Sequence, residues 1–416
     1  MPSAEGIGAR RAALQVLDAV LRRGQTLEAA GAAIRNLSPS DHALSLAIAG
    51  EALRRLPDVD GLIDSATRQR LPDDSKARMV LRLALAQKIG LGTPDHALVS
   101  TALPLVDGGP RRLVHGVLGT LLRRGVPKID SPSLPADVEA RWQSAWGEET
   151  VLAARRQIAK RPALDLSFAD EAEAQVYALE HGGVSLAPSN VRLESSSVAA
   201  LPGFEQGRWW VQDLAASLPA RLIPNEARNV IDLCAAPGGK TMQLAAAGHP
   251  VTAIDSSESR LGRLRDNLAR THLEAELVEA DALKWQADRQ YDAILLDAPC
   301  SATGTFRRHP EVLYRARPRQ IRDGAELQGT LLDRAANWLK PGGALVYSVC
   351  SLEPAEGEET VRAFLERNSR FKVDAPDRLP AFVPISPEGW VRILPGLLEE
   401  QGGLDGFFMA RLVRAG

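Results

Sequence analysis

The sequence predicts an α/β domain with a doubly wound parallel sheet, preceded by an all-α domain and a small α+β connecting domain. Two observations support this prediction. Short apolar runs alternate with helical stretches from about residue 209 onward, as in a parallel sheet covered on both faces. Residues 8–125 show only helical periodicity. We therefore expect three domains, which the length of 416 residues can accommodate: 1–130, 131–202 and 203–416.

The all-α region begins with apolar residues at helical spacing, such as Leu14, Leu17 and Leu21, followed by Gly24 as a C-terminal cap. Ser40 and Asp41 are candidate caps for a second helix. We expect that second helix through residues 43–53, and further helices from Asp73-Asp74-Ser75 to Gly90 and over 113–122. Three prolines then mark a linker over residues 126–135.

The α/β region contains six candidate strands and four candidate helices. The strands are expected at 229–233, 251–255, 275–279, 292–296, 344–349 and 407–412. The helices are expected at 240–247, 257–270, 320–339 and 355–367. The preceding segment, residues 136–202, has a mixed pattern that specifies no order of elements.

The composition, 45% hydrophobic and 25% charged, is typical of a soluble globular protein. Residues 1–24 contain arginine pairs and no continuous apolar core, so we expect no signal peptide. No apolar run approaches the ~18 residues of a membrane helix. Three unevenly spaced cysteines indicate a reducing compartment, the cytoplasm. The seven histidines and the cysteines make no metal-ligand spacing, so we expect no metal, and we expect a monomer.

Charge is distributed unevenly along the chain. Residues 1–130 carry 18 Lys and Arg against 13 Asp and Glu, whereas the remainder carries 32 against 39. The N-terminal part also contains five Arg-Arg pairs, at 10–11, 22–23, 54–55, 111–112 and 123–124. These pairs either complement the C-terminal ends of helix dipoles or contact phosphates of a nucleic acid.

A candidate cofactor loop joins a strand end to a helix, the usual ligand position in an open α/β sheet. Its glycines allow close approach of the backbone to a ligand. It consists of Cys234, Ala235, Ala236, Pro237, Gly238, Gly239 and Lys240. A nucleotide-phosphate loop ending in Gly-Lys-Thr would require Gly where Cys234 stands, so that interpretation fails.

Acidic residues follow the next two candidate strands. Asp255 ends one strand and could accept hydrogen bonds from both hydroxyls of a ribose, and Asp281, after the next strand, could reach an adenine edge. Each taken alone could instead cap a helix. With no G-x-G-x-x-G fingerprint present, the arrangement favours S-adenosylmethionine over a cofactor that contains a diphosphate.

Two cysteines follow later strands, in Asp297-Ala298-Pro299-Cys300 and Ser348-Val349-Cys350-Ser351. A free cysteine is often a small buried hydrophobe, and either of these alone would be interpreted that way. Two such cysteines at strand ends, beside a cofactor loop, favour a nucleophile and an assisting thiol.

These motifs resemble those of the RNA cytosine-C5 methyltransferases, and more closely the bacterial 16S ribosomal RNA enzymes of the Fmu/Sun (RsmB) type. The resemblance extends over residues 201–412. It also includes Leu201-Pro202-Gly203-Phe204, Val211-Gln212-Asp213, Ser301-Ala302-Thr303-Gly304, Arg307-Arg308-His309-Pro310 and Asp405-Gly406-Phe407-Phe408. Residues 8–125 are similar to the NusB-like RNA-binding domain of that type. The resemblance thus implies a Rossmann-like class I methyltransferase fold and ribosomal RNA as the partner.

The resemblance also implies roles for individual residues. Cys350 matches the nucleophile that adds to carbon 6 of cytosine, which makes carbon 5 able to attack a methyl group. Cys300 matches the cysteine that helps release the methylated RNA, and Asp297 would touch both cofactor and base. The 234–240 loop and Asp255 would bind S-adenosylmethionine, with Asp281 beside them.

The chain departs from the family pattern at five positions. Val349 replaces a Thr, Ala355 and Gly357 replace a Glu and an Asn, and Leu313 and Tyr314 replace a Lys and a Trp. The thiol chemistry is unaffected by these changes, which concern individual substrate contacts.

Several residues keep two interpretations. His309 could contact RNA phosphate or stabilise a turn. Lys240 could touch the cofactor carboxylate or begin a helix. Trp209 and Trp210 could stack on a base, although packing under the sheet fits their size better. Two alternative functions also remain: a tRNA cytosine-C5 methyltransferase, and a catalytically idle RNA-binding protein in ribosome assembly.

Overall fold

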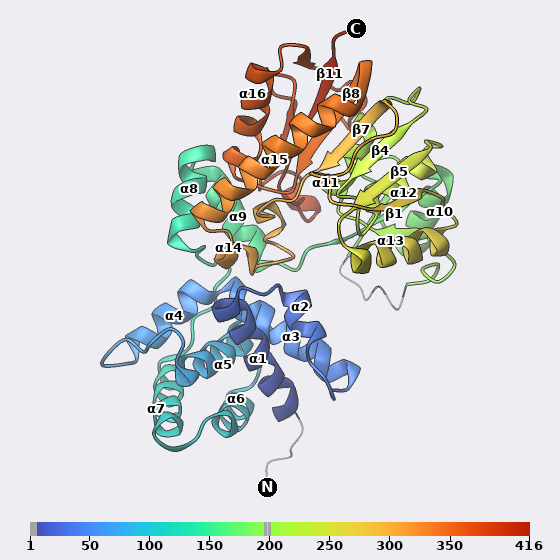
Figure 1. Ribbon diagram of the computed structural model, residues 1–416. Coiled ribbons are helices and arrows are strands. Elements are labelled where there is room, and N and C mark those ends of the chain that lie inside the picture. The colour runs from blue at the N-terminus through green and yellow to red at the C-terminus, as the bar shows by residue number, and fades with distance from the viewer. Residues whose placement is uncertain (1–5, 195–197, 199–200) are drawn as a thin grey trace. The chain divides into compact units, whose positions relative to one another are not determined.

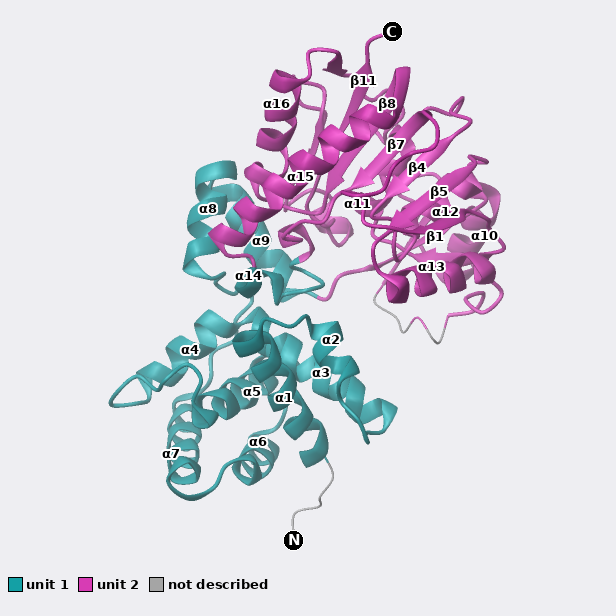
Figure 2. Cartoon of the chain, in the orientation of Figure 1, with its two compact units in different colours: residues 1–160, 306–315 teal, residues 161–305, 316–416 magenta. Residues whose placement is uncertain are grey.

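The chain divides into two compact units in the computed structural model (Figure 2). One unit consists of residues 1–160 and 306–315, and the other of residues 161–305 and 316–416. The structure describes residues 6–194, 198 and 201–416. The expected domain boundaries near residues 130 and 202 stay a prediction, and residues 1–5, 195–197 and 199–200 of those domains lie outside the described residues.

The regular elements of the first unit are all helices in its described residues, and over residues 8–125 this was predicted. Its longer elements are α1 (Ile7–Arg23), α2 (Leu27–Ala32), α3 (Pro39–Arg54), α4 (Leu56–Ser65), α5 (Lys76–Leu91), α6 (Asp95–Ala102), α7 (Gly108–Arg124), α8 (Ala136–Trp146) and α9 (Glu148–Ala159). Gly24 caps α1 in the left-handed conformation, and Ser75 caps α5 by accepting from Arg78 N. The expected cap of α3 was wrong, because the helix begins earlier, at Pro39, with Ser38 as its cap.

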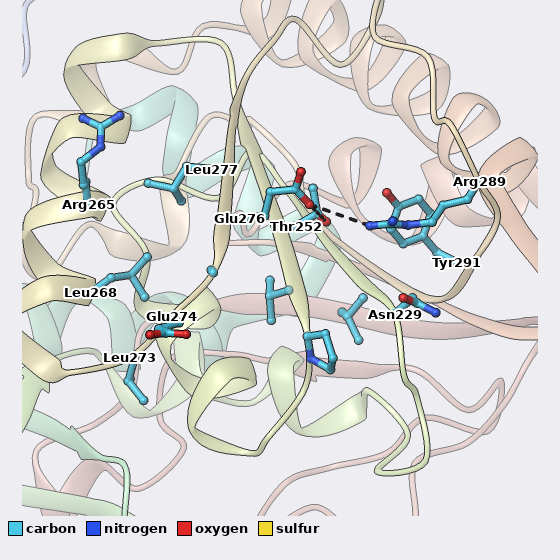
Figure 3. Close-up of a pocket in the computed structure, with 14 residues that line it drawn as sticks. Asn229, Thr252, Arg265, Leu268, Leu273, Glu274, Glu276, Leu277, Arg289 and Tyr291 are labelled. Carbon is cyan, nitrogen blue, oxygen red and sulfur yellow. Dashed lines mark hydrogen bonds and ion pairs between the residues drawn. The ribbon is translucent and has the colours of Figure 1, made fainter.

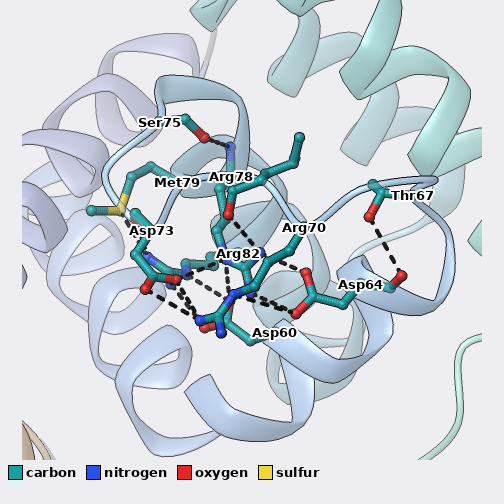
Figure 4. Close-up of polar contacts among 10 residues, drawn as sticks. Asp60, Asp64, Thr67, Arg70, Asp73, Ser75, Arg78, Met79 and Arg82 are labelled. Carbon is teal, nitrogen blue, oxygen red and sulfur yellow. Dashed lines mark hydrogen bonds and ion pairs between the residues drawn. The ribbon is translucent and has the colours of Figure 1, made fainter.

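Two buried arginines tie α4 to α5 (Figure 4). Arg78 donates to Asp64 at 2.6 Å, and Arg82 donates to Asp60 at 2.7 Å. The Arg78 side chain is fully buried, and its hydrogen bond holds the pKa of Asp64 below the usual value. Because a buried charge is tolerated only when it is paired, these arginines serve the fold of the unit.

Three of the five Arg-Arg pairs fall into two groups, one packed and one exposed. Arg54 and Arg55 are packed inside the unit, where they donate to the carbonyl oxygens of Ile158 and Ala159 at 3.1 and 3.5 Å. Arg111 and Arg112, near the start of α7, are exposed, as is the 123–124 pair at its end. The 54–55 pair therefore has a structural explanation, and the pairs of α7 remain candidates for phosphate contact.

The segment 306–315 belongs to the helical unit although it follows the Cys300 motif in sequence. The Phe306 ring lies 5.4 Å from the Trp142 ring. Glu311 accepts from Leu27 N at 3.1 Å, and Tyr314 donates to Leu53 O at 2.7 Å. The departure from the family pattern at Tyr314 thus lies in a contact within this unit.

The second unit contains an eight-stranded sheet in the order β10-β11-β8-β7-β4-β5-β6, with β9 also paired to β11 (Figure 1). The strands are β4 (Val230–Leu233), β5 (Val251–Asp255), β6 (Glu276–Glu279), β7 (Tyr291–Asp297), β8 (Leu339–Val349), β9 (Phe371–Val373), β10 (Val391–Ile393) and β11 (Phe407–Arg414). The pairs among β4 to β8 are parallel, and β11 is antiparallel to β8. This confirms the predicted doubly wound sheet.

Helices cover both faces of this sheet. Alternate strand residues such as Ile294 and Leu296 pack against α15 (Pro318–Trp338) and α16 (Glu358–Arg367). The intervening residues, such as Leu295, pack with α11 (Leu214–Ser217) and with Leu244 of α12 (Gly239–Ala246). α13 (Glu258–Thr271) packs its leucines with β5 and Trp210. Burial on both faces explains the continuous apolar runs of these strands.

A second, three-stranded sheet in the order β2-β1-β3 occupies the same unit. Its strands are β1 (Leu164–Phe168), β2 (Asn190–Leu193) and β3 (Trp209–Val211). The helix α10 (Glu171–His181) packs against β1 and β2. Arg192 pairs with Asp165 at 2.6 Å and also donates to the carbonyls of Gln401 and Gly403. Buried polar residues such as Asp165 and Arg192 interrupt these strands, so they lack the apolar runs that identified the strands of the larger sheet, and the sequence specified no order here.

Within the described residues, none of the helices combines the length and the apolarity needed to cross a membrane.

Candidate active site

The predicted site residues gather at the carboxyl ends of parallel strands in the second unit. Cys234 follows β4, Asp255 ends β5, and Asp297 ends β7. The chain leaves β4 toward β5 and β6 on one side and returns through β7 and β8 on the other. In open α/β sheets, ligands bind at this reversal of strand order.

The two motif cysteines meet at the ends of the neighbouring strands β7 and β8. The Sγ atoms of Cys300 and Cys350 lie 3.6 Å apart, within hydrogen-bonding distance for sulfur. The hydrogen bond to Cys350, together with burial, raises the pKa of Cys300 well above its usual value. Cys300 is therefore a protonated thiol at neutral pH and can stabilise a thiolate on Cys350.

Asp297 stands beside the thiols and is held by two side chains. Lys240 Nζ donates to one carboxylate oxygen at 2.8 Å, and Ser348 Oγ donates to the other at 2.8 Å. Burial opposes the charge on Lys240, but the Asp297 carboxylate outweighs it, so the pKa of Lys240 is raised. Lys240 therefore keeps its positive charge, and it contacts the site rather than only beginning a helix.

The candidate cofactor loop leaves β4 in a fixed conformation. Cys234 adopts the left-handed region at φ 61°, and Gly238 does so at φ 107°. A Cβ atom at Gly238 would lie 2.1 Å from a methyl group of Leu264, so glycine is required there. Burial raises the pKa of Cys234 to about 12, which keeps this third cysteine a neutral thiol.

Asp255 is the buried carboxylate beneath this loop. Its oxygens accept from Ala236 N at 3.2 Å and from Ser257 N at 3.1 Å. It therefore shapes the loop and the start of α13 in addition to any ligand contact. Asp281 is more exposed and accepts from Leu283 N at 2.9 Å, which makes it the cap of a turn after β6 in this structure.

Asp232, in β4, is a site residue that the sequence reasoning missed. It is fully buried, and Thr241 donates to its Oδ2 at 2.6 Å, whereas its Oδ1 has no hydrogen-bond partner among the described residues. Burial raises the pKa of Asp232 to about 7. A buried, unpaired carboxylate oxygen beside the candidate loop would be a favourable partner for a cationic group of a ligand.

This observation provides a test of the expected cofactor. S-adenosylmethionine carries an ammonium and a sulfonium group, and the orphaned Asp232 oxygen fits a cation. The loop 234–240, with Asp232 and Asp255, has the donors and acceptors to hold it. Among the described residues, no cluster of His, Cys, Asp and Glu could hold a metal ion.

The remaining candidates take different places. Trp209 and Trp210 are buried, at 0% and 2% exposure, so packing is their role.

His309 lies in the segment that belongs to the helical unit, and its Nδ1 is 3.7 Å from Oε1 of Glu311. A Cβ atom at Gly357 would lie 2.4 Å from Arg392 Nη2, which explains glycine where the family has Asn.

A hollow elsewhere in the second unit lies away from these residues (Figure 3). It is lined by Asn229, Thr252, Glu276 and Tyr291, which stand at or near the amino-terminal ends of β4 to β7. Ligands of open α/β sheets bind at the opposite, carboxyl ends. The hollow is therefore separate from the candidate active site.

Comparison with known proteins agrees with this geometry. The family model described as 16S rRNA methyltransferase RsmB/F matches residues 219–413, and the NusB family model matches residues 8–123. Ribosomal RNA small subunit methyltransferase B of Xylella fastidiosa (strain Temecula1) is 35% identical over 434 residues and covers 99% of both chains. The protein of the same name from Cronobacter sakazakii is 32% identical over 444 residues, again covering 99% of both.

A solved structure described as a methyltransferase homologue from Pyrococcus horikoshii shares the fold. It is 28% identical, with a TM-score of 0.57, and the match covers 71% of this chain and 98% of that one. The predicted enzyme class, cofactor and NusB-like region are thereby confirmed. The chain belongs to the RsmB/F family of S-adenosylmethionine-dependent RNA methyltransferases.

Proposed function

We propose that this protein methylates carbon 5 of a cytidine in 16S ribosomal RNA through a covalent adduct between Cys350 and carbon 6 of the base. The observation that carries the proposal is the pair of thiols 3.6 Å apart at the ends of β7 and β8, beside Asp297. The names of the relatives, which refer to the small ribosomal subunit, support the RNA target.

Carbon 5 of cytosine is a poor nucleophile, so a thiol is needed before any methyl transfer. The Cys350 thiolate adds to carbon 6, and the ring becomes an enamine whose carbon 5 attacks an electrophilic methyl group. A base then removes the carbon-5 proton, the electron pair restores the ring double bond, and Cys350 leaves as a thiolate. S-adenosylmethionine, when bound, supplies the electrophilic methyl group.

The surrounding residues suit these steps. Cys300, whose pKa is raised, remains a thiol that can donate to the Cys350 sulfur when that sulfur carries negative charge. This favours the formation of the Cys350 thiolate and its later departure from carbon 6. Lys240 and Ser348 hold the carboxylate of Asp297, so its position is fixed before the cytosine of the RNA arrives.

The two alternatives have less support. A tRNA substrate would leave the NusB-family region without the ribosomal role that the relatives' names indicate. A non-catalytic assembly factor would have no need for two cysteines in contact beside a paired Asp and Lys. We therefore keep the methylation of 16S ribosomal RNA as the proposal.

Bisulfite sequencing of 16S ribosomal RNA tests the proposal directly. A strain that lacks this protein should lose one protected cytidine, the wild-type chain should restore it, and the variant Cys350→Ala should not. Restoration by Cys350→Ala would refute the adduct, and an unchanged 16S pattern with a missing signal in tRNA would refute the target.

A further inference from the structure

Each motif cysteine is followed by a serine, and both serines reach the same carboxylate. Ser301 and Ser351 donate their hydroxyl protons to Oε2 of Glu356, the latter at 2.5 Å. The backbone N–H of Ser301 also donates to Oε1 of Glu356 at 2.8 Å. One side chain thus contacts the residues that directly follow Cys300 and Cys350.

Glu356 is fully buried, in the short turn between β8 and α16. Gln328 Nε2 donates to its Oε1 at 3.2 Å and to the carbonyl oxygen of Pro299 at 2.9 Å. Tyr347 OH donates to its main-chain oxygen at 2.5 Å. All these donors are uncharged.

Holding a buried carboxylate with uncharged donors is costly to the fold, because the charge gives up its hydration. A set of apolar residues in place of the carboxylate and all its donors could fill the same space at less cost. The arrangement is therefore explained better by what it holds in place than by stability alone.

The backbone around these loops is already close-packed. Gly304 N donates to Cys350 O at 3.0 Å, and Leu352 N donates to Thr303 Oγ1 at 3.0 Å. A Cβ atom at Gly304 would lie 2.0 Å from the carbonyl oxygen of Gly406. These contacts bring the loops together, and the Glu356 carboxylate fixes the residues next to both sulfurs.

We propose that Glu356 is a positioning residue that sets the distance and orientation of the Cys300 and Cys350 thiols through the hydroxyls of Ser301 and Ser351. The inference rests on the proposed function for its catalytic meaning, but the spacing of the thiols can be measured without RNA. Misplacement of a reacting group by about 1 Å can cost roughly a hundredfold in rate.

Glu356→Ala should lower kcat by roughly tenfold to a hundredfold and leave the KM for S-adenosylmethionine nearly unchanged, because the 234–240 loop is not touched. Glu356→Gln keeps the Oε1 acceptor for Ser301 N and Gln328, so it should recover part of the loss. Glu359, exposed on the helix α16 that follows Glu356, provides the matched control: Glu359→Ala and Glu359→Gln should behave as the wild type.

The first measurement uses RNA that contains 5-fluorocytidine, whose carbon 5 carries fluorine instead of a removable proton, so that the adduct accumulates. With S-adenosylmethionine present, the rate of forming a complex that survives denaturing electrophoresis should fall in Glu356→Ala and less in Glu356→Gln. Rates equal to the Glu359 controls would overturn the inference.

The second measurement needs no RNA. Diamide, as the oxidant, should join Cys300 and Cys350 in a disulfide, counted by peptide mass spectrometry, several times more slowly in Glu356→Ala than in the controls. If the wild type forms this disulfide but no RNA adduct, the proposed function fails while the positioning inference is still tested. Equal oxidation rates in all chains would refute the positioning role.

If Glu356→Ala does not fold, the inference is tested with variants in which one of the two serines is replaced by alanine. Ser351→Ala should slow adduct formation, because it frees the residue after the nucleophile. Ser301→Ala should chiefly slow resolution of the adduct, because it frees the residue after Cys300. If both variants match the wild type in both rates, Glu356 has no positioning role.

Discussion

The Sγ atoms of Cys300 and Cys350 lie 3.6 Å apart although the two residues are fifty positions apart in the sequence. Each thiol follows a strand of the parallel pair β7 and β8, whose register joins Asp297 to Ser348. The contact therefore arises from strand pairing, and it allows the two thiols to divide one reaction between them.

The first prediction concerns this division. Cys350→Ala should abolish methyl transfer. Cys300→Ala should still form the covalent adduct but resolve it slowly, so that a protein–RNA complex survives denaturing electrophoresis. If Cys350→Ala forms the complex and Cys300→Ala does not, the roles of the two thiols are reversed.

The second prediction concerns Asp255. Asp255→Ala should weaken the binding of S-adenosylhomocysteine by ~1–3 kcal/mol, because it leaves Ala236 N and the ligand hydroxyls without an acceptor. Affinity for RNA should be nearly unchanged. Calorimetry measures the effect, with Asp266→Ala, an exposed change on α13, as the control. Unchanged affinity would limit Asp255 to capping the loop.

The third prediction concerns pH. The pKa of Asp232 is raised to about 7 by burial, above the ordinary carboxyl value, so the folded protein keeps this proton over much of the acidic range. A cation binds the ionised form, so affinity for S-adenosylhomocysteine, through its ammonium group, should rise as the pH increases through about 7 and level off above it.

In the variant Asp232→Asn the side chain cannot ionise. This variant should bind S-adenosylhomocysteine more weakly than the wild type at pH 8, and its affinity should depend little on pH between 6 and 8. Titration calorimetry at several pH values compares the two proteins. The same pH profile in both would assign the dependence to another group.

The fourth prediction concerns the exposed arginines of α7. Replacing Arg111, Arg112 and Arg123 by Gln should lower affinity for 16S ribosomal RNA fragments and reduce the log–log salt slope, by roughly 0.7–0.9 for each phosphate that the variant no longer neutralises. Cofactor affinity should not change. Filter binding between low and moderate salt measures the slope.

A control with the same loss of charge replaces three exposed arginines of the second unit, Arg265, Arg289 and Arg319. The control should keep the wild-type slope. Equal slopes for the wild type and the α7 variant would show that these arginines make no phosphate contacts that affect binding.

The sequence by itself determined the class of fold and the edge of the sheet that carries the site. Every expected strand from 229–233 to 407–412 has a counterpart, and strands buried on both faces, such as β4 and β5, read as apolar runs. The residues after those strands, such as Asp255 and Cys350, could be identified because parallel strands end at one edge. Strands β1 and β2 could not, since buried polar residues such as Asp165 and Arg192 interrupt their apolar pattern, and β3, β9 and β10 could not, since three residues carry no period.

Only the tertiary structure decided which side chains meet. It brought Cys300 to Cys350, joined Ser301 and Ser351 to Glu356, left Asp232 Oδ1 without a partner among the described residues, and assigned residues 306–315 to the helical unit. The physical reason is that the pattern of apolar and polar residues along one segment reflects only the periodicity of that helix or strand and the faces that it buries. Contacts between side chains depend on strand order and register, which are set by the packing of the whole sheet.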